Sequence, residues 1–170
     1  MQYINSIDPQ ILAVMTKISV ALVLGVILGM ERTIAHKMAG MRTYALISMG
    51  SALFVGISDL IVTKFSAMPA INPLLLPAQI VVGIGFIGGG LIFVHRNTVR
   101  GLTTAAGLWV AAGIGMAIGF GMYDLGVFVT IITLFIFTIL WRIEDKIKYW
   151  VGIGNNECTI DNDTGDVTCK

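Results

Sequence analysis

Five long apolar stretches dominate the pattern of hydrophobic and polar positions along the chain. The hydrocarbon core of a bilayer is roughly 30 Å thick, so a helix needs about 20 apolar residues to cross it. The strands of a membrane β-barrel would alternate apolar and polar residues, and these stretches do not alternate. The pattern therefore predicts an all-α membrane protein, a bundle of five transmembrane helices at residues 11–30, 44–62, 77–94, 101–121 and 125–141.

The basic residues that flank these spans indicate how the bundle is oriented. Lys and Arg concentrate in the short cytoplasmic connections of membrane proteins. The connections on one side of the predicted bundle hold Arg32, Lys37, Arg42, Arg96, Arg100, Arg142, Lys146 and Lys148. The connections on the other side hold Lys64. We therefore expect the N-terminus outside the cell and the C-terminus in the cytoplasm.

The composition agrees with a membrane protein and excludes several other classes. Hydrophobic residues make up 56% of the 170 residues and charged residues 12%, whereas soluble domains carry roughly 25% charged residues. The net charge of +1 excludes a basic nucleic-acid binder, and the apolar content excludes a disordered chain and an ordinary soluble enzyme. The sequence has no Ser/His/Asp set, HExxH motif or P-loop, so we expect neither catalysis nor a cofactor.

The predicted spans suggest a membrane domain at residues 1–143 and a short cytoplasmic tail at residues 144–170. The tail has the alternation and turn residues of a β-hairpin. A lone hairpin is marginally stable in water, so the tail either needs a partner or is what remains of a larger domain. Its two cysteines should stay reduced in the cytoplasm. The facing pairs in the hairpin would be Cys158 with Cys169 and Ile160 with Val167.

Small residues recur at a four-residue spacing inside the spans, which lets helix backbones approach closely in a membrane. The first span has Gly25 and Gly29, and the third span has Gly85 and Gly89. We interpret these ridges as the packing surfaces of a tight bundle. The alternative is that the glycines at 83–90 break the third helix and line a cavity, as in transporters.

Polar residues cluster where the spans reach the cytoplasmic boundary. A helix N-terminus has unpaired N–H groups and a partial positive charge, so an Arg and a hydroxyl there can hold an anion such as a phospholipid phosphate. Glu31 lies near the negative end of its helix and is expected to pair with Arg42 or Arg100. Ordinary headgroup anchoring is the alternative role for the arginines. The cluster consists of Glu31, Arg32, Arg42, Thr43, Arg100, Thr103 and Thr104.

Two charged residues lie deeper in the spans, at depths that match when counted from the outer surface. Lys17 in the first span and Asp59 in the second could therefore pair. Pairing would offset the cost of a charge in hydrocarbon, roughly 2.5–3.5 kcal/mol on insertion scales. Gln79 begins the third span on the same side. A magnesium path needs several oxygen ligands, and Glu31, Asp59 and Gln79 are few, so the sequence assigns no metal ligands.

Four ordered motifs resemble those of the MgtC/SapB family of bacterial membrane proteins. They lie at residues 25–32, 39–43, 79–90 and 99–109, include Gly40 and Gly101, and extend the resemblance over roughly residues 18–140. The resemblance implies a five-span domain in the bacterial inner membrane. It also implies a link to growth in low magnesium and to survival inside host cells. The chain departs from the family pattern after Trp141, where members often add a small cytoplasmic βαββαβ domain, and before Gln79, where they tend to carry a basic residue.

These observations leave two functions from different classes. The first is a regulatory membrane module in magnesium homeostasis, whose glycine-rich faces contact a membrane-protein partner or a second copy of the chain, within a lipid bilayer. The second is a transporter or channel for Mg²⁺ or another small ion. It would need a hydrated cavity between the first, third and fourth spans, reached by Glu31, Asp59 or Gln79. A role in lipid handling is a further alternative.

Overall fold

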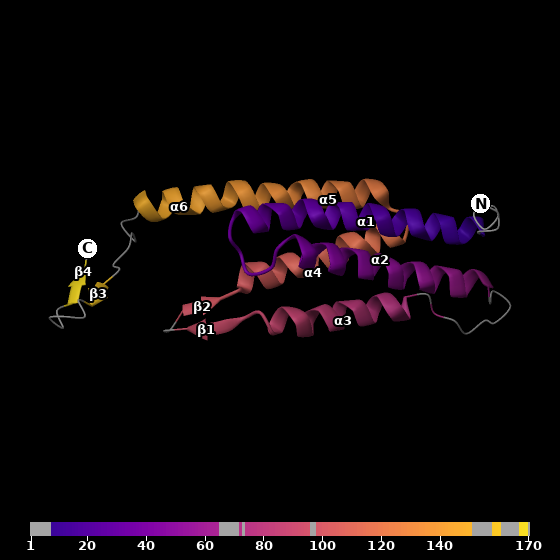
Figure 1. Ribbon diagram of the computed structural model, residues 1–170, viewed down its shortest axis with the longest axis horizontal. Coiled ribbons are helices and arrows are strands. Elements are labelled where there is room, and N and C mark those ends of the chain that lie inside the picture. Colours follow the sequence, from indigo (N-terminus) through magenta and orange to yellow (C-terminus); the bar gives the residue numbers. More distant parts are fainter. Residues whose placement is uncertain are drawn as a thin grey trace. The chain divides into compact units, whose positions relative to one another are not determined.

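The computed structural model describes residues 8–64, 72, 74–95, 98–150, 158–160 and 167–169. The chain forms two compact units, Met1–Leu134 and Phe135–Lys170. The first unit holds the helices α1 to α5, which lie alongside one another, and a two-stranded antiparallel sheet (Figure 1). Its elements are α1 (Pro9–Ile34), α2 (Met41–Lys64), α3 (Leu75–Gly89), β1 (Phe93–His95), β2 (Thr98–Arg100), α4 (Leu102–Gly119) and α5 (Tyr123–Phe135), the last ending at the border between the units.

Four helical segments of the described chain are long and apolar enough to cross a membrane: Pro9–Ile34, Met41–Lys64, Leu102–Gly119 and Tyr123–Ile143. They coincide with four of the five predicted spans. α3, at the place of the third span, is shorter, with 15 residues.

The end predicted for the third span was wrong. The helix stops at Gly89, and the chain then forms β1 at Phe93–His95 rather than continuing to Val94. Consecutive glycines at 88–90 favour an end there, because glycine is among the weakest helix formers. The alternative of a helix broken at 83–90 holds only for the last of these glycines, because α3 is continuous from 83 to Gly89 and ends there.

The core of the first unit is the contact among α1, α2 and α4. α1 packs along α2, and α4 packs against both of them. Fully buried side chains line the contact, among them Leu28 from α1, Tyr44 from α2 and Leu108 from α4. α3 lies against α4 and, over a smaller area, against α2. Most of its surface is exposed, including Phe86 at 86%. In a membrane such apolar side chains face lipid or another protein.

Glycines allow the core helices to touch. A Cβ on Gly25 would lie 2.7 Å from the carbonyl oxygen of Tyr44, and one on Gly115 would overlap the carbonyl oxygen of Ser48. Ser48 is fully buried between these two glycines of α1 and α4. The prediction of a tight bundle is therefore confirmed for this seam. Close backbone approach of this kind is how membrane helices associate without a hydrophobic drive between them.

The second unit begins with a π-helical turn at Ile136–Leu140, followed by α6 (Trp141–Trp150). Helical structure thus continues past the predicted end of the fifth span. The unit also contains β3 (Cys158–Ile160) and β4 (Val167–Cys169), which pair antiparallel. Cys158 is opposite Cys169 and Ile160 is opposite Val167, so the predicted hairpin register is confirmed. The predicted turn between the two strands, at 161–166, lies outside the described residues.

Candidate functional site

Glu31 and Arg32 form an ion pair where α1 ends. The Nε of Arg32 donates a hydrogen bond to Oε2 of Glu31, and the Arg32 side chain is only 3% exposed. A cation is favoured in the last turn of a helix, because that end carries the negative pole of the helix dipole. The expected pairing of Glu31 with Arg42 or Arg100 was wrong. Both arginines are exposed, and no ion pair of either occurs within the described residues.

Thr33 connects the end of α1 to the beginning of α2. Its hydroxyl donates a hydrogen bond to the carbonyl of Gly29 at 2.9 Å and accepts one from the backbone N–H of Met41 at 3.1 Å. Gly40 leaves room for this contact, since a Cβ there would lie 2.6 Å from Oγ1 of Thr33. One of the N–H groups predicted to hold an anion at the start of α2 is therefore occupied from within the chain.

Sequence reasoning missed Thr33, although a signal was present. Gly25, Gly29 and Thr33 are spaced by four, so all three lie on the α1 face that meets α2. Beside this contact, Thr43 is half-buried and Arg42 is exposed. The threonine with the structural role is thus on the preceding helix and not on α2 itself.

The beginning of α4 is built differently. Gly101 precedes it with φ of +87°, and no side chain caps the helix. A Cβ on Gly101 would overlap the carbonyl oxygen of Leu91, so both the backbone conformation and the space require glycine. Of the two predicted hydroxyls, Thr103 is exposed and Thr104 is buried. Arg100 lies in β2, opposite Phe93.

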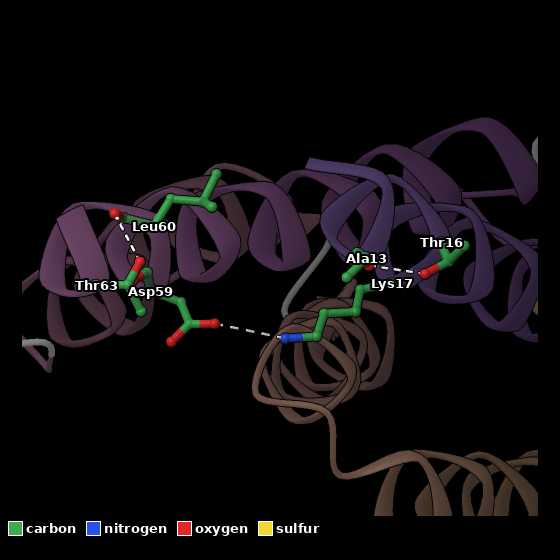
Figure 2. Close-up of polar contacts among 6 residues, drawn as sticks. All are labelled: Ala13, Thr16, Lys17, Asp59, Leu60 and Thr63. Atoms are coloured by element: carbon green, nitrogen blue, oxygen red, sulfur yellow. Dashed lines mark hydrogen bonds and ion pairs between the residues drawn. The ribbon is translucent and has the colours of Figure 1, made fainter. Parts of the chain in front are cut away.

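Lys17 and Asp59 form the second polar contact, at the other end of the first unit. Nζ of Lys17 lies 3.7 Å from Oδ2 of Asp59, which confirms the predicted pair. Figure 2 shows Lys17 reaching from α1 towards Asp59 on α2, while Thr16 and Thr63 bond back to their own helices. The Lys17 side chain is 16% exposed and that of Asp59 is 56% exposed.

The third group of predicted residues lies on α3. Gln79 is exposed and lines a groove of about 530 Å³ between α2 and α3, together with Ser51 and Gly83. Gly85 and Gly89 have no heavy atom within 4 Å of where a Cβ would be. The expectation that they pack inside the bundle was wrong, because α3 presents this ridge outward. Gly88, one position away, makes the contact with Ala105 of α4.

The predicted site residues are therefore divided among three places. Lys17 and Glu31 are 14 residues apart on one helix, which corresponds to about 21 Å. In the part of the chain that the structure describes, no three His, Cys, Asp or Glu side chains are grouped so that they could hold a metal ion. The arrangement supplies ion pairs and helix contacts rather than a centre of oxygen ligands.

Comparison with known proteins gives relatives along most of the helical part. The sequence model of the MgtC family matches residues 18–146. The chain is 42% identical over 122 residues to "Putative magnesium transporter YhiD" of Escherichia coli K12, covering 71% of this chain and 57% of that protein. It is 45% identical over 86 residues to MgtC of Brucella abortus, covering 51% of this chain and 34% of that protein. It is 41% identical over 103 residues to SapB of Bacillus subtilis, covering 59% and 43%.

The matched regions span about half of these relatives' length or less. No solved structure matches the chain. The family match covers well over half of the residues and includes α2, α3 and α4 in full. With its membrane-length apolar helices, the protein is a multi-pass protein of the bacterial inner membrane and belongs to the MgtC family.

Proposed function

We propose that this protein acts in magnesium homeostasis as a regulatory membrane module and does not itself conduct the ion. The magnesium link rests on the family and on the printed name of the relative from Escherichia coli. The choice of regulation over transport rests on one observation: the two carboxylates that were candidates for an ion path each form an ion pair with a basic side chain. Glu31 is paired with Arg32 and Asp59 with Lys17, at opposite ends of α1.

Ion pairing of this kind disfavours a magnesium path. Mg²⁺ keeps several waters and binds through carboxylates and other oxygen ligands in near-octahedral geometry. An adjacent ammonium or guanidinium repels a divalent cation and competes for the same oxygens. The seam between α1, α2 and α4 is also closed by contacts of Gly25 and Gly115 with backbone atoms of α2, which leaves no room for hydrated ions there.

We further infer that five segments cross the membrane, with the N-terminus outside and the C-terminus in the cytoplasm. In this arrangement residues 1–143 form the membrane domain and residues 144–170 the tail. The exposed ridge of Gly85 and Gly89 on α3 would then contact a membrane-protein partner or a second copy of the chain, since small residues favour close helix contact. The motif residues of α1, α2 and α4 would have a structural role: they would hold these helices together so that the ridge on α3 stays exposed.

Transport of Mg²⁺ or another small ion is the alternative function, and one observation favours it. Gln79 and Ser51 place polar groups on the groove between α2 and α3. Polar side chains inside the membrane are costly and often mark a substrate path. The remaining lining is mostly apolar, for example Ile80 and Phe86, so we rank this function second.

Two measurements on the full chain, one on purified protein and one in cells, separate these functions. The first is Mg²⁺ entry into dye-loaded proteoliposomes containing the native protein, Glu31→Ala, Asp59→Ala or Gln79→Ala. The second is growth in low magnesium of a bacterial host lacking its own MgtC-family protein. Regulation predicts rescue of growth without Mg²⁺ entry. Saturable entry that is lost in these variants would establish transport, and absence of both effects would contradict a role in magnesium homeostasis.

A further inference from the structure

The β1–β2 hairpin lies close to the ends of the two apolar helices that it connects. Three residues, 90–92, lie between the end of α3 and β1, and Gly101 alone separates β2 from α4 (Figure 1). The base of the hairpin is closed by the tight contact between Gly101 and the carbonyl of Leu91. The N–H of Leu91 in turn bonds to the carbonyl of Gly88 at 3.1 Å. The hairpin therefore stays within a few residues of the helix ends.

α3 is too short to cross the membrane by itself, so the hairpin that follows it must contribute to the third crossing. Fifteen helical residues extend about 22 Å, which is less than the roughly 30 Å of the hydrocarbon core. Three residues of β1 add about 10 Å at the rise of an extended strand. The first two residues of β1, Phe93 and Val94, are apolar and exposed, and so is Ile92 directly before them.

The strand register gives the hairpin two unlike faces. Val94 lies opposite Val99, and His95 lies opposite Thr98. Since side chains alternate along a strand, the two valines share one face, and the other face holds His95, Thr98, Phe93 and Arg100. Val94 is 70% exposed and Val99 is 60% exposed. The first unit thus leaves the apolar face of the hairpin without a cover.

Charge and backbone chemistry indicate what covers this face. The sequence from 60 to 123 contains no Asp or Glu, so the charge that the hairpin presents through Arg100 complements anionic lipid headgroups. The unpaired outer edges of the strands exclude a place deep in the hydrocarbon, where such groups cannot be satisfied. A free position in water is also disfavoured, because an isolated two-stranded hairpin is marginally stable there.

We propose that the β1–β2 hairpin lies in the headgroup layer of the bilayer. Val94 and Val99 face the acyl chains, and His95 and Thr98 face water, with Arg100 beside the lipid phosphates. The strands then rise obliquely from the end of α3 through the border between hydrocarbon and headgroups, so that the hairpin adds length to the third crossing, which α3 alone is too short to make. This arrangement does not depend on whether the protein regulates or transports.

Spin labels on both faces test this position in the full chain. Single cysteines replace Val94, Val99, His95 or Thr98, in a background with Cys158→Ser and Cys169→Ser. The protein is reconstituted in vesicles of phosphatidylethanolamine and phosphatidylglycerol. Collision rates are measured with oxygen, which partitions into lipid, and with a nickel chelate present on both sides of the membrane. Phe86→Cys, on the exposed face of α3, provides the reference for a lipid-facing label.

The expected result is alternation between the two faces. The ratio of oxygen to nickel collisions should be at least about fivefold higher at 94 and 99 than at 95 and 98, as for an amphipathic element lying in the interface. Preferential nickel contact at all four positions would overturn the proposal by placing the hairpin in water. Shielding of 94 and 99 from both reagents would overturn it in favour of a protein surface on that face.

Discussion

Glycine has two distinct environments in this protein at the scale of single residues. A Cβ on Gly29 would lie 2.5 Å from the Cα of Met41 and 2.9 Å from its nitrogen, so no side chain fits between α1 and α2 there. On α3, by contrast, the space around Gly85 is empty to 4 Å. The same residue type at the same four-residue spacing therefore closes one helix contact and leaves another helix face bare.

Alanine at these two positions should have opposite effects on stability. Gly29→Ala forces backbone atoms of α2 to move and should lower the free energy of unfolding by about 1–3 kcal/mol, the usual cost of overpacking. Gly85→Ala should raise it by about 0.5–1 kcal/mol, because alanine favours the helix and meets no atoms. Unfolding by SDS in mixed micelles, followed by circular dichroism, measures both. Equal destabilisation by the two variants would contradict the packing of α1 on α2.

The buried guanidinium of Arg32 should be important for the fold, whereas the exposed one of Arg42 should not. Arg32→Gln removes the charge that faces Glu31 and should cost about 3 kcal/mol, as expected when one partner of a buried pair is lost. Arg42→Gln should stay within about 0.5 kcal/mol of the native protein, as is usual for surface changes. The same SDS titration applies, and comparable losses in the two variants would show that burial of Arg32 does not matter.

At the scale of helices, the hydroxyl of Thr33 should stabilise the start of α2. Thr33→Val keeps the shape of the side chain but removes the hydrogen bond to the N–H of Met41. The loss should be about 1 kcal/mol, typical of an N-terminal cap, with faster amide exchange at the first turn of α2. Thr16→Val is the control, because the Thr16 hydroxyl bonds within α1 and is exposed. Unchanged exchange at Met41 in Thr33→Val would contradict the cap.

Hydropathy predicted where helices lie but not where every helix ends. The run at 77–94 does not distinguish a helix from a helix followed by a strand, because all its positions except Gln79 are apolar and they show no period. The glycines at 88–90 favour an end there, but glycines also recur inside the other spans, so they did not mark the end at Gly89 from sequence alone. The tail hairpin was predictable because its turn residues and its alternation are both local signals.

At the scale of the whole molecule, ion pairs were predictable only where depth determined the partner. Lys17 and Asp59 are each an isolated charge within an apolar helix, so matching depths were enough to pair them. Glu31 had three arginines nearby at the boundary, and the sequence did not show that the adjacent Arg32, rather than Arg42 or Arg100 on another helix, would be its partner. The outward direction of Gly85 could not be foreseen either, because a small-residue ridge does not identify the surface that it meets.

The number of membrane crossings determines on which side of the membrane the later helices end. That number is five if α3 crosses and four if it does not. If α3 and the hairpin cross, five crossings place Met122 outside and Trp150 in the cytoplasm, as the basic residues after Tyr123 favour. If α3 does not cross, four crossings reverse both positions. Alkaline phosphatase fused after Met122 should therefore be active, and green fluorescent protein fused after Trp150 should fluoresce. An inactive first fusion together with a dark second fusion would show that 15 helical residues and a hairpin do not complete a crossing.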